Sequence, residues 1–483
     1  MFSCNYWTFL LNQRVMSNST EIQTEIESFI SDQVQNGLLT PDTGIAISVI
    51  NSKGSIYQGT FGLRNRNKKL PVSSKTIFPV SSSTKAFTSL AWLKLSEVNN
   101  VTLSNPLNQN QEQIKLLDPI ASASASILDI LSHRIGIPAN DLLWLLSSFS
   151  NEELANRIQY LPALPEGFKK NFTYSNLLYS ALEIPFKNLA NENLESFITS
   201  KILRPLEMSA TTFSTHEKFT TEDFASPYSG DHSMSFRSVE NILPAGGLQS
   251  NLEDLNKWLR FLLLDAKNDY PMMLKSHNTV KEPQGFILQG LEWLGDFPDY
   301  GLGWFIGKMN GKQTFYHPGL IDGFSTLLLF SPEANLGISI LINANLSSIP
   351  GLLAQKICNT LSGIAPRVRP EQSPTPPPPP STTVADLPKT VQASAAALVG
   401  KYEDPAYGII EILSVQQELH LKYGTHSWPL TFNDENNATF VVNVFGLQLP
   451  IPANFEITGK KATKVSIPFS LDPRVSMRNF LSC

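Results

Sequence analysis

Hydrophobic and polar residues follow two different spacings at the start of this chain. Apolar residues three or four positions apart over Glu21 to Val34 predict an amphipathic helix. The continuous apolar run from Gly44 to Ile50 predicts a buried strand. Asn51-Ser52-Lys53-Gly54 predicts a hairpin turn into a second strand at Ile56 to Gly62. The chain therefore begins with one helix and two paired strands.

Helical spacing dominates the middle of the chain, and extended runs return beyond Gly301. The predicted helices are Ala123 to Leu131, Glu152 to Ile158, Leu177 to Ile184, Leu194 to Leu203, Glu253 to Leu264 and Leu352 to Leu361. The later predicted strands are Gly303 to Gly307, Phe324 to Phe330 and Gly337 to Asn343. Strands at both ends with helices between them predict an α+β fold, an α/β sandwich with a helical lobe, whose sheet joins residues distant in sequence.

A proline-rich stretch separates this region from a different pattern at the end of the chain. Arg367 to Pro388 includes Pro374 and the run Pro376 to Pro380, which favours stiff polyproline II and cannot join a sheet. A spacer is the preferred interpretation, and an SH3-type docking site is the alternative. Short strand patterns then alternate with turns, which predicts a small all-β, barrel-like module. We divide the chain into an extension at 1–19, a large domain at 20–365, a linker at 366–389 and a β domain at 390–483.

Composition narrows the classes of partner. The formal net charge of −5 over 483 residues, with no Lys/Arg-rich run, argues against nucleic acid and anionic membranes. Three widely separated cysteines and the lack of paired histidines predict neither a disulfide framework nor a metal site. The first residues make a poor signal peptide, and no apolar run is long enough for a membrane span, so a cytoplasmic location is expected.

The candidate chemistry begins with Ser82-Ser83-Thr84-Lys85, the one Ser-x-x-Lys in the sequence. Residues three apart share a helix face, so the Ser82 hydroxyl and the Lys85 amine should meet. A serine is a poor nucleophile at its ordinary pKa, and a desolvated lysine can act as the neighbouring base. Alone, this short motif is weak and matches many proteins by chance.

Two further motifs follow in order, Tyr174-Ser175-Asn176 and His317-Pro318-Gly319. The order Ser-x-x-Lys, Tyr-x-Asn, His-x-Gly resembles the serine β-lactamase and penicillin-binding-protein superfamily, most closely its class C-like branch of β-lactamase-related serine hydrolases. The resemblance spans about residues 20 to 362. The C-terminal module resembles the lipocalin-like barrel that some members carry. The resemblance thus implies a β-lactamase/transpeptidase-like domain followed by a small barrel.

This resemblance implies a role for each motif residue. Ser82 is the expected nucleophile of an acyl-enzyme, and Lys85 and Tyr174 are expected to move its proton. Asn176 is expected to donate a hydrogen bond to the substrate. The oxyanion is expected between the backbone N–H groups of Ser82 and Leu320.

The third motif departs from the family pattern. His317-Pro318-Gly319 stands where Lys-Thr-Gly is usual, so the lysine and hydroxyl that would hold a β-lactam carboxylate are missing. We expect Gly319 to let substrate approach the strand closely and His317 to help bind it; Lys85, with His317 as a second candidate, is expected to supply positive charge near Tyr174. At most weak β-lactamase activity follows.

Three functions remain open at this stage. The first is a serine hydrolase, esterase or D-peptidase-like, acting on an ester, amide or peptide bond. The second transfers the acyl group instead, as an acyltransferase, transpeptidase or penicillin-binding-protein-type thioesterase that cyclises a peptide. The third is a non-catalytic scaffold that binds acyl or peptide ligands. All three imply a small-molecule or peptide ligand and no cofactor, and a homo-oligomer is left open. His133 is interpreted as a structural residue behind the site.

Overall fold

The structure is a computed structural model of the whole chain. It describes residues 20–108, 114–165, 167–213, 223–280, 296–345, 348–364, 395–445, 447–470 and 477–483. The predicted extension at 1–19 and the linker at 366–389 lie outside the described residues. Contacts group the chain into two compact units. We call Met1–Leu103 with Pro185–Arg369 the sheet unit, and Ser104–Ile184 with Pro370–Cys483 the barrel unit.

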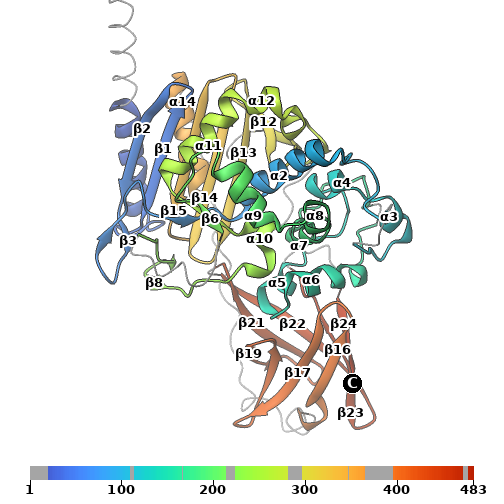
Figure 1. The fold of residues 1–483 in the computed structure, drawn as a ribbon. Helices are drawn as coiled ribbons and strands as arrows, with labels where there is room; N and C mark the ends of the chain where they lie inside the picture. Colours follow the sequence, from blue (N-terminus) through green and yellow to red (C-terminus); the bar gives the residue numbers. More distant parts are fainter. Residues whose placement is uncertain are drawn as a thin grey trace, which may run out of the picture. The chain divides into compact units, whose positions relative to one another are not determined.

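The sheet unit is built on an eight-stranded antiparallel sheet with the order β10-β11-β12-β13-β14-β15-β1-β2 (Figure 1). Ile45 on β1 pairs with Ile342 on β15, so the sheet joins residues that are distant in sequence, as the sequence pattern predicts. Strands β1, β14 and β15 are buried along nearly their whole length, which requires cover on both faces. The strands are β1 Ile45–Asn51, β2 Gly54–Phe61, β10 Asn278–Thr279, β11 Asp296–Tyr300, β12 Phe305–Met309, β13 Lys312–Ile321, β14 Phe324–Ser331 and β15 Leu336–Ile342.

Helices cover the sheet on both faces. In Figure 1, α11 (Leu252–Leu264) lies on the near face and α14 (Ile349–Ser362) on the far face. Helix α2 (Thr84–Asn99) packs beside α11 through Phe87 and Trp258, whose stacked rings have centroids 4.0 Å apart. The predicted N-terminal helix is present at residues 20–35. Shorter helical elements of this unit are η1 Ser81–Ser83, α9 Leu194–Ile198, η3 Thr199–Leu203, η5 Glu240–Ile242, α10 Leu243–Gly246, α12 Ala266–Asp269 and α13 Pro271–Leu274.

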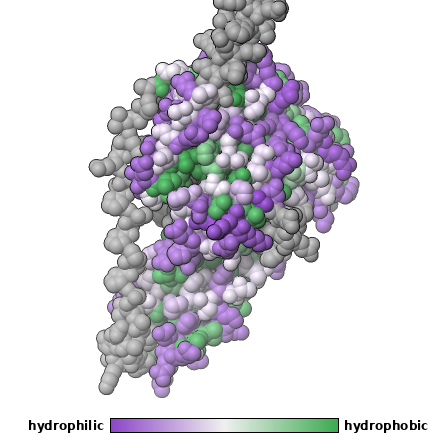
Figure 2. All heavy atoms as spheres, turned by 90° about the vertical axis from the view of Figure 1, so that its left-hand side faces the viewer, coloured by the Kyte–Doolittle hydropathy of each residue, from purple (hydrophilic) through white to green (hydrophobic). Residues whose placement is uncertain are grey.

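Small sheets complete the unit. The three-stranded sheet β5-β9-β6 joins β5 (Phe78–Pro79) to β9 (Leu248–Ser250) and β6 (Thr212–Phe213). Two-stranded sheets pair β3 (Leu63–Asn65) with β4 (Leu70–Pro71), and β7 (Tyr228–Ser229) with β8 (His232–Ser233). Strand β2 is an edge strand with an alternating burial pattern, as expected where one face meets solvent. Figure 2 views the molecule from the side that lies at the left of Figure 1, and hydrophilic residues predominate there around a smaller apolar patch.

The barrel unit combines short helices with a nine-stranded antiparallel sheet that curls into a nearly closed barrel. Trp428 on β19 and Phe440 on β21 bring the two ends of the sheet together, with ring centroids 5.5 Å apart. The helices are α3 Pro119–Ser124, α4 Ile127–Leu131, α5 Asp141–Leu146, α6 Asn151–Arg157, η2 Ile158–Tyr160 and α7 Asn176–Ala181, and α8 Glu183–Ala190 follows at the unit boundary. The strands are β16 Gly400–Asp404, β17 Gly408–Val415, β18 Glu418–Tyr423, β19 His426–Pro429, β20 Thr431–Phe432, β21 Asn437–Val444, β22 Leu447–Thr458, β23 Lys461–Ile467 and β24 Arg478–Ser482.

The α+β fold class with a C-terminal barrel-like sheet is confirmed, and the differences are local. The helix predicted over Ala123 to Leu131 is two helices, because Ser126 forms a capping box with Asp129 and starts α4 afresh. Strand β22 was not predicted. It holds Pro450 and Pro452, which cannot donate to a ladder and so obscure a strand pattern. Within the described ranges, no helix is both long and apolar enough to cross a membrane.

Candidate active site

Ser82 lies in the one-turn helix η1, directly before α2. The preceding strand β5 is fixed by β9, since Val80 N donates to Leu248 O at 2.9 Å. Leu248 N in turn donates to Thr84 Oγ1 at 3.0 Å, so β9 also holds the first residue of α2. Ser81 adopts a positive φ of 49°, an unfavourable backbone conformation for a serine. The surrounding contacts therefore hold Ser82 in a strained turn, with its side chain almost completely buried.

Lys85 lies one turn further along, as the motif spacing predicts. Its Nζ is 3.2 Å from Ser82 Oγ and 2.8 Å from the Ala245 carbonyl oxygen. Lys85 is 0% exposed, so its amine is shielded from bulk solvent. Thr88 Oγ1 donates to Pro244 O at 2.7 Å, which fixes α10 against the same face of α2. The Ala245 carbonyl was not predicted as part of this site.

The His317-Pro318-Gly319 segment of β13 lies against η1. Ser83 Oγ donates to the His317 carbonyl at 3.2 Å, and Thr326 Oγ1 on β14 donates to Val80 O at 3.3 Å. A Cβ on Gly319 would overlap Val80 O and Thr326 Oγ1, so this position requires glycine. The register of β12 with β13 ends at Tyr316, whereas the pairing with β14 continues through Ile321. The structure therefore brings Ser82, Lys85, His317, Gly319 and Leu320 together within the sheet unit.

His317 is completely buried and neutral at physiological pH. Desolvation is the main cause that lowers the pKa of His317 from 6.5 to about 3; Lys85 adds to this when it is protonated, and the hydrogen bond to Pro318 opposes it. Its Nδ1 lies 2.7 Å from the Pro318 carbonyl oxygen, which only accepts, so Nδ1 carries the proton. Nε2 can then accept from the Tyr300 hydroxyl at 3.3 Å. The expectation that His317 supplies positive charge near Tyr174 was wrong, because burial keeps the ring uncharged.

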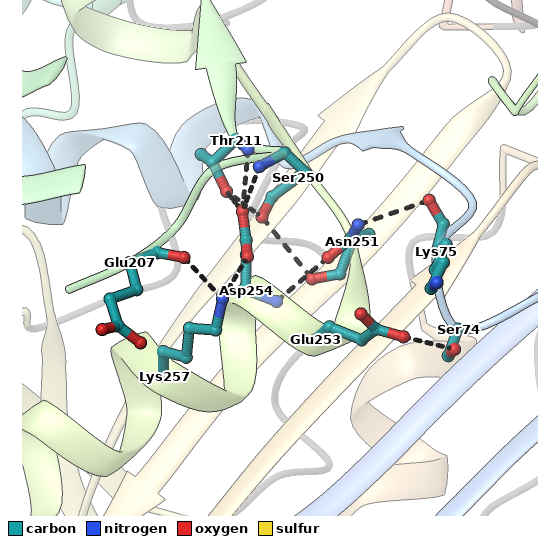
Figure 3. A network of polar contacts seen from close by, with 10 residues as sticks. Ser74, Lys75, Glu207, Thr211, Ser250, Asn251, Glu253, Asp254 and Lys257 are labelled. Atoms are coloured by element: carbon teal, nitrogen blue, oxygen red, sulfur yellow. Dashed lines mark hydrogen bonds and ion pairs between the residues drawn. The ribbon is translucent and has the colours of Figure 1, made fainter. Parts of the chain in front are cut away.

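A network of polar contacts anchors β9 behind η1 (Figure 3). Asp254 Oδ2 accepts from the backbone N and Oγ1 of Thr211, each at 2.8 Å, and its Oδ1 pairs with Lys257 at 3.0 Å. Thr211 Oγ1 also lies 2.7 Å from Ser250 Oγ at the end of β9. Asn251 Oδ1 caps α11 by accepting from Asp254 N. The start of α11 is thereby tied to the strand that holds Val80 and Thr84.

Tyr174-Ser175-Asn176 begins α7 in the barrel unit. Ser175 is the N-cap, and its side chain accepts from Leu178 N at 3.3 Å. Ser175 N donates to His133 Nδ1 at 3.2 Å, and the His133 ring packs on Tyr174 with centroids 4.5 Å apart. His133 is 0% exposed and has a positive φ of 57°. It therefore supports the Tyr-x-Asn turn from behind, in line with its structural interpretation.

Asn176 is held by a carboxylate that the sequence analysis missed. Its Nδ2 donates to Asp141 Oδ1 at 2.9 Å, and the same oxygen accepts from Trp144 Nε1 at 2.7 Å. Asp141 begins α5, and it and Asn176 are each 3% exposed. Nothing in the local sequence marks Asp141 apart from its place at a helix start, because its partner lies 35 residues away. That Tyr174 and Asn176 act together with Ser82 stays a prediction from the motif order.

The residues present offer no metal site in the part of the chain that the structure describes. No group of three or more His, Cys, Asp or Glu side chains gathers there in a way that could hold a metal ion. The functional groups of the three motifs include the hydroxyl of Ser82, the amine of Lys85, the phenol of Tyr174 and the amide of Asn176. Such a set suits acyl transfer through a serine.

The antiparallel sheet with helices on both faces, and the serine–lysine pair at the start of α2, define a β-lactamase/transpeptidase-like fold. The profile of the family described as Beta-lactamase matches residues 41–352, and the chain belongs to this family.

Two relatives and one solved structure illustrate the similarity. Protein flp of Staphylococcus aureus (strain COL) is 26% identical over 348 residues, 69% of this chain, and the chain spans 66% of the length of that relative. Unguisins hydrolase ungD of Aspergillus violaceofuscus (strain CBS 115571) is 25% identical over 471 residues, 86% of this chain and 82% of the relative. The octameric penicillin-binding protein homologue from Pyrococcus abyssi has a TM-score of 0.60 at 23% identity, covering 95% of this chain and 99% of that one. The last similarity shows the fold alone.

Proposed function

We propose that the protein is a serine hydrolase that cleaves an ester, amide or peptide bond through an acyl-enzyme at Ser82. The observation that carries the proposal is the 3.2 Å distance between Lys85 Nζ and Ser82 Oγ, together with the complete burial of Lys85. Burial favours the neutral amine of a lysine, and a neutral amine at this distance can take the serine proton. The serine oxygen then attacks the substrate carbonyl.

The proposal also assigns roles to residues of the second and third motifs. Tyr174 passes the proton to the leaving group, and Asn176 donates a hydrogen bond to the substrate. The N–H groups of Ser82 and Leu320 stabilise the oxyanion. Support comes from the tight packing of Gly319 on η1, which places β13 beside the nucleophile, and from the ordered Tyr-x-Asn turn over His133.

Hydrolysis is favoured over acyl transfer because a relative that aligns with 86% of this chain is named a hydrolase. The neutral His317 lacks the fixed charge that would attract a β-lactam carboxylate, which favours esterase or D-peptidase-like activity over β-lactamase activity. Acyl transfer to an amine or alcohol remains the second candidate. Adding an amine acceptor to an ester assay distinguishes the two, because a transferase gives the acylated amine in place of the free acid.

Replacement of the nucleophile tests the proposal. Ser82→Ala should lower p-nitrophenyl ester turnover at least about 10³-fold, since it removes the nucleophile, and Tyr174→Phe should lower turnover of an alkyl ester or amide, whose leaving group must be protonated, by a similar factor. Ser96→Ala is the matched control, because Ser96 Oγ only bonds Leu93 O at 2.7 Å within α2. Full activity in Ser82→Ala would overturn the proposal.

A further inference from the structure

The β strands of the barrel unit contact its helices through closely packed turns. Gly424, between β18 and β19, has a positive φ of 56°, and a Cβ there would come within 2.6 Å of Leu146 O at the end of α5. At Gly408, at the start of β17, a Cβ would lie 3.1 Å from the Phe149 ring and 3.7 Å from the Arg157 guanidinium. Ser470 Oγ donates to Ala139 O at 2.5 Å. These contacts join the strands and the helices of the barrel unit through both backbone and side-chain atoms.

The turn between β16 and β17 is the most strongly built of these contacts. Asp404 Oδ1 accepts from the backbone N of Ala406 at 2.8 Å and of Tyr407 at 2.9 Å. Arg478 pairs with both oxygens of Asp404 at 2.9 Å, and the carboxylate is 3% exposed. From α6, Arg157 donates to the Ala406 carbonyl at 3.2 Å. Arg478 and Arg157 therefore both hold the turn in place, and Tyr407 is part of this turn.

The Tyr407 side chain reaches the loop before α5. Its hydroxyl lies 2.9 Å from Asn140 Oδ1 and 2.5 Å from the Phe469 carbonyl oxygen, so its one proton is shared between these two acceptors. Asn140 Nδ2 donates to Pro138 O at 2.6 Å, which fixes the orientation of the amide. Burial is the main cause that raises the pKa of Tyr407 well above its ordinary value, so the hydroxyl stays protonated and can donate. Tyr407 is 0% exposed.

Asn140 is followed by Asp141, the residue that holds Asn176. Tyr407 in the β16–β17 turn is hydrogen-bonded to Asn140, and Asn140 is joined through the backbone to Asp141. Asp141 in turn accepts the hydrogen bond from Asn176. We propose that Tyr407 is a positioning residue for the substrate-binding amide of Asn176, so that the C-terminal β domain tunes recognition of an amide group in the acyl part of the substrate. This inference rests on the proposed function, which assigns substrate contact to Asn176.

Paired substrates and a matched variant test the inference on the full chain. Tyr407→Phe removes only the hydroxyl, and Tyr402→Phe removes an equally buried hydroxyl that donates to Leu398 O at 2.7 Å inside the β domain. The substrates are two p-nitrophenyl esters, one with an amide in its acyl group and one with a plain alkyl chain. We expect Tyr407→Phe to lower kcat/KM about tenfold for the amide ester and less than about twofold for the alkyl ester. Tyr402→Phe should leave both unchanged.

A double-mutant cycle separates positioning from a general loss of stability. In an Asn176→Ala background, Tyr407→Phe should cost nothing further on the amide ester, because both changes remove the same interaction. Equal losses on both esters, or additive effects in the cycle, would overturn the inference.

Labelling of Ser82 by a fluorescent phosphonate is measured in parallel on the unmodified protein. If Ser82 is not labelled, the proposed function fails. If it is labelled while Tyr407→Phe behaves like Tyr402→Phe, the inference alone fails.

Discussion

At the scale of single residues, burial sets the charge state of the candidate site. Lys85 and His317 are both 0% exposed, and each has its polar atoms directed at protein oxygens. For His317 the consequence is a pKa of about 3 and a neutral ring. His317 therefore does not supply the positive charge of the lysine that is usual at this position of the third motif. It positions β13 through Pro318 and Tyr300.

His317 should make the sheet unit sensitive to acid. Between pH 6.5 and about 3 an unfolded chain binds a proton on this histidine, whereas the folded chain excludes it. The corresponding stability is present above pH 6.5 and is lost as the pH falls. Unfolding free energies from urea titration should fall by about 2 kcal/mol more between pH 7 and pH 5 in the unmodified protein than in His317→Gln. Exposed His232→Gln is the control, and an identical pH dependence in His317→Gln would contradict this account.

Sequence reasoning identified Ser82 and Lys85 as neighbours from their motif. It missed Asp141 and Tyr407, whose contacts depend on the tertiary fold. Ser82 and Lys85 are recognisable because their spacing matches one helical turn. Asp141 and Tyr407 are not, because a carboxylate or phenol is ordinary in any sequence and its partner is chosen by tertiary packing. Tyr407 and its partner Asn140 are 267 residues apart. The charge of His317 was also beyond sequence reasoning, since it depends on complete burial.

At the scale of elements, the site depends on how closely β13 approaches η1. Strands with strong apolar runs, such as β1 and β14, and helices with clear periodicity, such as α11, were predictable. The two-part helix α3–α4 and the proline-containing β22 were not, because a local cap and ladder pairing override the apolar pattern. The close approach of β13 to η1 was not predicted: the sequence analysis assigned Gly319 to the approach of substrate, whereas Val80 O and Thr326 Oγ1 occupy the space beside it.

Gly319→Ala should therefore damage the site through packing. The added methyl would overlap Val80 O and Thr326 Oγ1 and come within 3.2 Å of Ser81 Cβ, which forces η1 away from β13. We expect a loss of about 1–3 kcal/mol in unfolding free energy and at least about tenfold lower ester turnover. Gly400→Ala is the control, because its Cβ would meet only the Tyr402 side chain, at 3.8 Å or more. Unchanged turnover in Gly319→Ala would show that this packing does not position the nucleophile.

At the scale of the whole molecule, the C-terminal strands belong to the same compact unit as one segment of the predicted large domain. Contacts group residues 104–184, which carry Tyr174 and Asn176, with the C-terminal strands. The β domain is thus packed on the segment that bears one of the three candidate motifs, Tyr174-Ser175-Asn176. Sequence patterns indicated the barrel but not its packing partner, because the contacting turns are fixed by backbone geometry at Gly408 and Gly424. Its suggested role is support of a substrate-binding loop.

The most direct test of the central claim is the intact mass of the protein during turnover of an activated ester, with the modified residue located by peptide mapping. The account predicts a mass increase of one acyl group, mapped to Ser82 and absent from Ser82→Ala. D-amino-acid amides and nitrocefin, measured in the same way, compare substrate classes. Turnover without any covalent adduct, or an adduct mapped to a residue other than Ser82, would contradict the account.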